Sequence, residues 1–226
     1  MRAKTKIQPA APSAKTPKLP PNAVKHSAIV LRHLQELFPE PEISLQYRNA
    51  FSFLVAVLLS AQCRDERVNQ VTPALFARAD SAEKMRELSL EELEDRIRPC
   101  GLFRHKARFL KQLAEVVVSR YGGELPSSLE ELEGLPGVGH KSAAVVASQF
   151  FGKNAFPVDT HIHRCAKRWG LSEGKNVRQT ERDLCSLYPE PLWRTLHLQI
   201  ILYARRYCPA RGHRLEYCPV CRELRT

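Results

Sequence analysis

The sequence has no apolar run long enough to cross a membrane. Its longest apolar stretch runs only from Phe51 to Ala61, which is typical of a buried helix. No apolar stretch follows the first lysines, so we expect no secretory signal. A regular alternation of polar and apolar residues is also missing, and this argues against a β-sheet. These absences favour an intracellular, helical protein.

Acidic residues are scarce relative to basic ones. The 226 residues include 24 Asp and Glu against 35 Lys and Arg, for a formal net charge of +11. Such an excess suits a polyanionic partner such as nucleic acid, with an anionic membrane surface as the competing partner. Residues 1–22, rich in lysine, proline and alanine, have almost nothing to bury, and we expect them to form a disordered basic tail.

Helical spacing recurs along the rest of the chain. Apolar residues repeat at this spacing between Ala28 and Phe38 and again from Leu110 to Val118, where Gly122 and Gly123 end the pattern. Because helix follows helix without a strand pattern, the expected fold class is all-α.

A glycine hairpin separates two of these expected helices. Ser127 and Glu130 have the spacing of a capping box, and Gly134 is a natural helix end. Gly137 and Gly139 let the main chain approach a ligand closely, and a helix from Lys141 to Phe151 follows. The amides and dipole at its start favour an anion such as a phosphate, although a plain turn between helices has the same pattern.

Two ionisable residues accompany this hairpin. Lys141 lies just inside the second helix, and an amine becomes a nucleophile once burial or a nearby cation lowers its pKa. Asp159 precedes Thr160 and His161 in the position of an N-cap, where helix amides keep a carboxylate ionised. Taken singly, a solvated lysine and a structural cap explain these residues as well.

A resemblance to a known family favours the functional interpretation of both residues. The segments LPGVGHKSA (135–143), VDTHIHR (158–164) and LLSAQ (58–62) closely resemble the helix-hairpin-helix DNA glycosylases of the endonuclease III type, and the likeness runs from about Ala28 to Tyr207. It implies a bifunctional DNA glycosylase and abasic-site lyase of base excision repair, which removes oxidised pyrimidines. It also implies that Lys141 attacks the sugar C1′ and that Asp159 assists.

Further roles follow from the same resemblance. Gln62 would enter the duplex near an extruded nucleotide, and Leu102 would act as a wedge against the orphaned base, although a leucine folded into the core is an open alternative. We also expect Gly137 and Gly139 to contact DNA, together with His161 and Arg164. Two helical lobes are implied, a six-helix lobe at residues 42–154 and a terminal lobe at 23–41 and 155–226, with a DNA-binding cleft between them.

The cysteines indicate a metal site and not a disulfide framework. Seven is an odd number, and three of the seven fall in Cys208-x4-His213-x4-Cys218-x2-Cys221. The resembling family places four cysteines here around a 4Fe–4S cluster, whereas this chain has a longer first gap and no cysteine after Cys221. Three interpretations of this motif therefore stay open: a 4Fe–4S cluster with His213 as fourth ligand, a zinc ion, or no metal.

The partners and rival functions complete these expectations. We expect double-stranded DNA with damaged bases or abasic sites as the partner, no membrane, a monomer, and a location in the cytoplasm or nucleoid. A noncatalytic helix-hairpin-helix DNA-binding protein is the rival from another class, and a monofunctional mismatch glycosylase is the rival enzyme. Lys141 together with Asp159 argues against both.

Overall fold

The computed structural model describes residues 18–225, and within that range every regular element is a helix. The tail expected at residues 1–22 therefore lies mostly outside the described residues. The α-helices are α1 (Ala23–Leu37), α2 (Ala50–Leu59), α3 (Asp65–Arg78), α4 (Ala82–Glu87), α5 (Leu90–Ile97), α6 (Phe103–Tyr121), α7 (Leu129–Glu133), α8 (His140–Gln149), α9 (Thr160–Arg168), α10 (Val177–Leu187), α11 (Glu190–Arg206) and α12 (Pro219–Glu223). Two short 3₁₀ helices, η1 (Arg98–Cys100) and η2 (Leu215–Tyr217), complete the set. The prediction of an all-α fold is confirmed.

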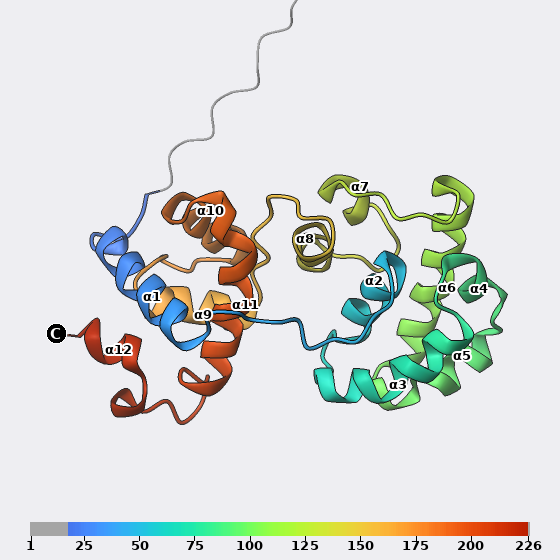
Figure 1. Cartoon of the computed structure of the whole chain (residues 1–226), viewed down its shortest axis with the longest axis horizontal. Coiled ribbons are helices and arrows are strands. Elements are labelled where there is room, and N and C mark those ends of the chain that lie inside the picture. Colours follow the sequence, from blue (N-terminus) through green and yellow to red (C-terminus); the bar gives the residue numbers. More distant parts are fainter. Residues whose placement is uncertain (1–17, 226) are drawn as a thin grey trace, which may run out of the picture.

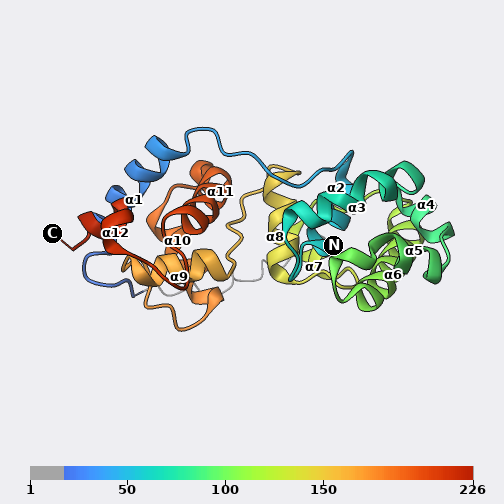
Figure 2. The same ribbon diagram turned by 90° about the horizontal axis from the view of Figure 1, so that it is seen from below.

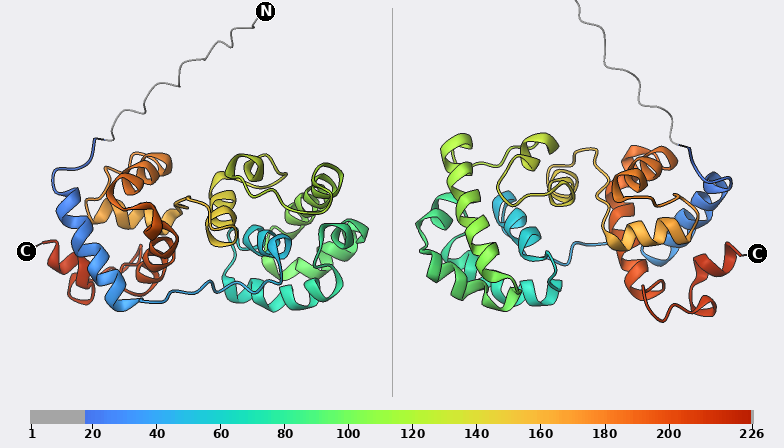
Figure 3. Two further views of the ribbon diagram at one scale, coloured as in Figure 1. Left: turned by 45° about the horizontal axis from the view of Figure 1, so that its top comes forward. Right: turned by 180° about the vertical axis from the view of Figure 1, so that it is seen from behind.

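The helices form two groups, each with its own hydrophobic core. Figure 1 shows α2 to α8 on one side and α1 with α9 to α12 on the other. The first core is built mainly from α2, α3, α5, α6 and α8, and the second from α1, α9 and α11 with the C-terminal cysteines. Two connecting stretches, between α1 and α2 and between α8 and α9, join the groups, as the views in Figures 2 and 3 agree. The first group holds seven α-helices where we expected six.

The helix α2 is the apolar centre of the first group. Every residue from Phe51 to Leu59 is buried, so this helix has no solvent-facing side. Its N-terminus is fixed by Asn49, whose side chain accepts from the Ser52 amide at 2.9 Å while the Ser52 hydroxyl accepts from the Asn49 amide at 2.8 Å. This reciprocal cap fixes the residue at which α2 begins.

Several helix bounds differ from those expected. The first helix begins at Ala23 and not near Ala28, because buried Ala23 and Ser27 extend its apolar face by a turn. Helix α8 runs from His140 to Gln149, a residue earlier at its start than expected and two earlier at its end. Among the described residues, none of the helices has the length and apolar character that a membrane span requires.

Candidate active site and metal cluster

The hairpin between α7 and α8 is held in place by its first glycine. Gly137 has a φ of +75°, and an added Cβ would come within 2.9 Å of the Phe109 side chain. A larger residue would therefore meet both backbone strain and a clash with α6. The cap before the hairpin is Ser128 with Glu131, and not Ser127 with Glu130 as predicted. Each of the two adjacent serines is followed by a glutamate three residues later, so the sequence pattern fits both registers.

The second glycine leaves open space at the start of α8. Gly139 is the N-cap of that helix, and an added Cβ would meet nothing within 4 Å. Protein packing alone therefore does not require glycine here. The first amides of α8 have no intrahelical acceptors, so the hairpin presents donors and a positive dipole end. This is the arrangement expected of an anion-binding hairpin.

Lys141 and Asp159 line one pocket between the two groups of helices. The cavity measures about 480 Å³ and is also lined by residues of α2, α11 and the loop before α3. Burial lowers the pKa of Lys141, against the opposing effect of the carboxylates of Asp159 and Asp65. Asp159 caps α9 as predicted, since its carboxylate accepts from the Ile162 amide at 2.8 Å. An amine whose charged form is disfavoured thus shares a cavity with a carboxylate held by a helix start.

Two histidines complete the wall of this pocket. His197 is buried in α11, and its Nδ1 lies 2.8 Å from the carbonyl of Pro157. Burial and the nearby Lys141 lower the pKa of His197 to about 4, so its ring is neutral at pH 7. His161 lines the same cavity, and burial lowers its pKa also. His197 lies inside α11 and belongs to no sequence motif that would mark it as a pocket residue.

Gln62 and Leu102 share an unusual backbone conformation. They are the two non-glycine residues with positive φ among the described residues, at 53° and 46°. Such a conformation costs about 1 kcal/mol or more, and persists only where the surroundings impose it. Both side chains are exposed, Leu102 to 57%, so the alternative of a leucine folded into the core is wrong. Both line one small cavity, with Gly137 on its wall.

Lys106 connects the segments that carry these two residues. It lies inside α6 and is only 8% exposed. Its ammonium group donates to the carbonyl of Leu59 at 2.9 Å and to the carbonyl of Cys100 at 2.8 Å. Leu59 ends the helix before Gln62, and Cys100 lies two residues before Leu102. One buried amine therefore fixes both backbone segments from which the exposed Gln62 and Leu102 project.

Arg164 is directed toward the C-terminal cysteines. Its guanidinium donates to the carbonyl of Cys208 at 3.1 Å and lies 3.3 Å from Nδ1 of His161. His163, two residues from His161, points elsewhere and bonds the Thr180 hydroxyl at 2.8 Å. The two histidines are two residues apart on α9, so they lie on different faces of the helix.

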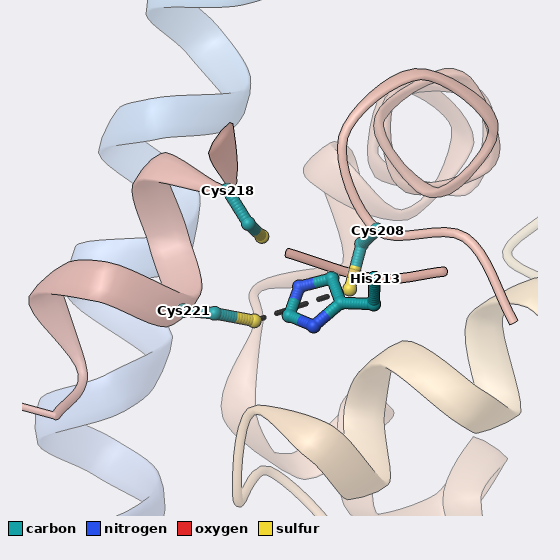
Figure 4. A group of neighbouring side chains, drawn as sticks. All are labelled: Cys208, His213, Cys218 and Cys221. Atoms are coloured by element: carbon teal, nitrogen blue, oxygen red, sulfur yellow. Dashed lines mark hydrogen bonds between the residues drawn. The ribbon is translucent and has the colours of Figure 1, made fainter. Parts of the chain in front are cut away.

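The four predicted metal ligands come together. The ligand atoms of Cys208, His213, Cys218 and Cys221 all lie within 4.8 Å of one another (Figure 4). The three cysteines are buried, and none forms a disulfide. Nε2 of His213 is also buried and has no hydrogen-bond partner among the described residues. A buried imidazole nitrogen without a partner beside three thiols is the donor set of a metal ion.

Surrounding groups support the cluster. Arg168 donates to the Cys208 sulfur at 3.1 Å, and the Tyr203 hydroxyl lies 3.4 Å from the Cys218 sulfur. The buried thiol of Cys165 also bonds to Cys208, and these neighbours keep the pKa of Cys208 well below its usual range. The sequence pattern missed Cys165, because it lies more than forty residues before the cluster.

The comparisons with known proteins agree with this arrangement. Residues 55–190 match the family described as the HhH-GPD superfamily base excision DNA repair protein. The chain is 39% identical to endonuclease III of Bacillus subtilis (strain 168) over 204 residues, covering 88% of this chain and 93% of that protein. The chain belongs to the endonuclease III family. Its members are DNA glycosylases with abasic-site lyase activity, and the predicted family, fold and enzyme class are confirmed.

Solved structures of endonuclease III match over nearly the whole fold. One is a non-covalent endonuclease III–DNA complex, which aligns with a TM-score of 0.85 at 38% identity and covers 89% of this chain and 96% of that one. Another is a trapped endonuclease III–DNA covalent intermediate, with the same TM-score and identity and a coverage of 89% and 97%. The two-group arrangement described above is therefore the endonuclease III fold.

Proposed function

We propose that Lys141 is the nucleophile of this family member and that Asp159 stabilises positive charge on the reacting sugar. The observation that carries the proposal is that both line one cavity, in which burial lowers the pKa of the amine. A lowered pKa leaves a larger fraction of the amine unprotonated at any given pH than in a solvated lysine, and the unprotonated amine is the nucleophilic form. The cavity lies between the two groups of helices, where an extruded nucleotide could enter.

The reaction follows from this pairing. Nζ of Lys141 forms a bond to C1′ of the damaged nucleotide, while the bond from C1′ to the base breaks and the base leaves with its electron pair and a proton. The sugar ring then opens to a Schiff base between Nζ and C1′. Loss of a proton from C2′ breaks the bond from C3′ to its oxygen, which nicks the strand on the 3′ side of the lesion. The Asp159 carboxylate stabilises the charge that develops on the sugar.

Double-stranded DNA with oxidised pyrimidines or abasic sites is the proposed substrate. The hairpin at Gly137 and Gly139 would hold a backbone phosphate through its amides, without reading sequence. Gln62 and Leu102 project on a strained backbone and would fill the space left in the duplex, since an unstacked base costs a few kcal/mol. His161 and Arg164 stay predicted DNA contacts. The solved complexes of relatives with DNA, one of them covalent, support this proposal.

Borohydride trapping on a duplex with one abasic site tests the proposal. We expect the wild type to give an adduct that survives denaturation, and Lys141→Ala to bind the duplex but give none. Lys153→Ala, which removes an exposed lysine beyond the end of α8, is the matched control and should trap fully. An adduct of normal yield in Lys141→Ala would overturn the assignment. Binding without any wild-type adduct would indicate the noncatalytic DNA-binding protein.

A further inference from the structure

The structure assigns the C-terminal cluster to one tetrahedral metal ion, and we propose that this ion is Zn²⁺. The ligands are the thiolates of Cys208, Cys218 and Cys221 and the imidazole of His213. The proposal departs from the 4Fe–4S cluster that the family resemblance implies. It rests on how far apart the ligand atoms lie.

Ligand separation distinguishes one ion from a cluster. Four donors around one zinc, each thiolate about 2.3 Å from the metal, lie roughly 3.8 Å apart at the corners of a tetrahedron. In a 4Fe–4S cluster each ligand binds a different iron on the outside of a cube, which places ligand atoms roughly 6 Å apart. Here all four ligand atoms lie within 4.8 Å of one another, and the sulfurs of Cys208 and Cys221 are 3.9 Å apart. The spacing fits one ion and is too short for the cube.

The fourth donor supports the same assignment. His213 lies in the longer gap between Cys208 and Cys218, and its Nε2 is buried without a hydrogen-bond partner in the described part of the chain. Coordination would satisfy this nitrogen, which otherwise costs free energy. Figure 4 shows the imidazole and the three sulfurs turned toward a common centre. Three thiolates and one imidazole form an ordinary structural zinc site.

The neighbouring groups fit the charge of that site. Zn²⁺ with three thiolates and a neutral imidazole has a net charge of −1, and Arg168 donates to the Cys208 sulfur at 3.1 Å. The hydroxyl of Tyr203 accepts from the Val220 amide at 2.9 Å and lies against the Cys218 sulfur. Such groups around the ligands fix their orientation and tune the metal.

The proposed ion has a structural role. It would connect the end of α11, the loop at 209–217 and α12 through one centre. Helix α12 then docks on α1, where Arg32 donates to Glu223 at 2.7 Å and His33 contacts the same carboxylate at 2.8 Å. Because the ion has four protein ligands, no position stays open for water or substrate, and it takes no part in the reaction.

Metal and acid-labile sulfide analysis of the full chain, purified anaerobically from medium with both iron and zinc, tests the proposal. We expect about one zinc per chain and no sulfide. Replacing the zinc with Co²⁺ should give the intense visible bands of a tetrahedral thiolate site. Attempted reconstitution with iron and sulfide should leave the protein without a stable brown chromophore. About four irons and four sulfides per chain, a single iron, or no metal at all would each overturn the proposal.

Variants at the fourth ligand separate coordination from folding. His213→Ala should lose most of its zinc and lower the midpoint of thermal unfolding, because a structural zinc contributes directly to folding. His213→Cys keeps four donors and should retain the zinc with little change in that midpoint. His105→Ala, which removes an exposed histidine of α6, is the matched control and should keep full zinc content. Unchanged zinc content in His213→Ala would overturn the role of His213.

Discussion

The active-site pocket and the cysteine cluster both take ionisable side chains out of water, but they use them differently. In the pocket, Lys141 and Asp159 share an open cavity of about 480 Å³, so a reacting sugar has room beside the amine. In the cluster, four donor atoms lie within 4.8 Å of one another and face a common centre. An ionisable group with open space beside it can react with a substrate. A set of donor atoms that face one another is suited instead to hold a metal. The comparison predicts that changes in the pocket alter rates, while changes in the cluster alter stability.

The largest expected effect is on the nucleophile. Lys141→Met keeps the length and packing of the side chain but removes the amine. We expect single-turnover nicking of an abasic duplex to fall by roughly four orders of magnitude or more, with DNA affinity within a few-fold of wild type. Quench-flow rates with a binding titration measure both quantities. A residual rate within tenfold of wild type would contradict the role of Lys141.

The next effect concerns the carboxylate. Asn is as good an N-cap as Asp, so Asp159→Asn keeps the bond to the Ile162 amide while removing the charge. We expect turnover to fall by about 10² to 10³ with little change in thermal stability. If stability fell and turnover did not, Asp159 would be a cap without a role in the reaction.

Buried His197 should appear in the pH dependence of stability. Its pKa is about 4 in the folded protein against an ordinary value of 6.5, so the unfolded chain binds the extra proton between these pH values. Stability is therefore lost as pH falls from 6.5 to 4, by about 3 kcal/mol. Denaturant unfolding across this range should show the loss in wild type and not in His197→Gln. An equal loss of stability in the variant would mean that other groups cause it.

His140 gives a control of opposite sign. It contacts Glu133 and also Glu181, at 2.8 Å, and these bonds raise its pKa against the effect of burial. A raised folded pKa contributes stability that is present below pH 6.5 and lost as pH rises through the folded value. His140→Gln should therefore remove the loss of stability that accompanies a rise in pH above 6.5. The loss of stability at acid pH should be unchanged.

The smallest effect is expected at Lys106, which acts on the duplex only through Gln62 and Leu102. Lys106→Met should lower nicking of duplex DNA roughly tenfold, because both projecting segments lose their shared anchor, at about 1.4 kcal/mol of barrier. Single-stranded abasic DNA should be cut at a nearly unchanged rate, since it has no base stack to fill.

Lys111→Met is the matched control for that prediction. Lys111 lies in the same helix and also donates to two carbonyls, those of Arg86 at 2.5 Å and Leu88 at 2.6 Å, but away from the projecting residues. Lys111→Met should lower the stability of the protein without changing the ratio of the nicking rates on duplex and single-stranded DNA. Equal losses on duplex and single strand in Lys106→Met would reduce that residue to a purely structural anchor.

Much of the fold and the site could be predicted from sequence. Local patterns sufficed for the all-α class, the buried α2, the cap at Asp159 and the four metal donors, because each depends on residues close in the chain. The resemblance supplied the expectation for Lys141. The cap at Ser128 could not be chosen over Ser127, because each serine is followed by a glutamate three residues later.

Other features depend on contacts that sequence does not show. Lys106 reads as a basic surface residue until α6 is packed against the ends of α2 and η1. His197 reads as core until α11 brings it beside Lys141. Cys165 reaches Cys208 only because α9 packs against α11. The spacing of the cysteines indicates a metal, but the distances between the donor atoms, on which the proposal of zinc rests, follow only from the fold.

In the proposed reaction, the amine of Lys141 in the pocket forms the covalent bond to DNA. The most direct test is to reduce the wild-type Schiff base on an abasic duplex, digest the protein, and map the modified peptide by tandem mass spectrometry. We expect one modified residue, Lys141. Modification of another lysine, or of the N-terminal amine, would contradict it.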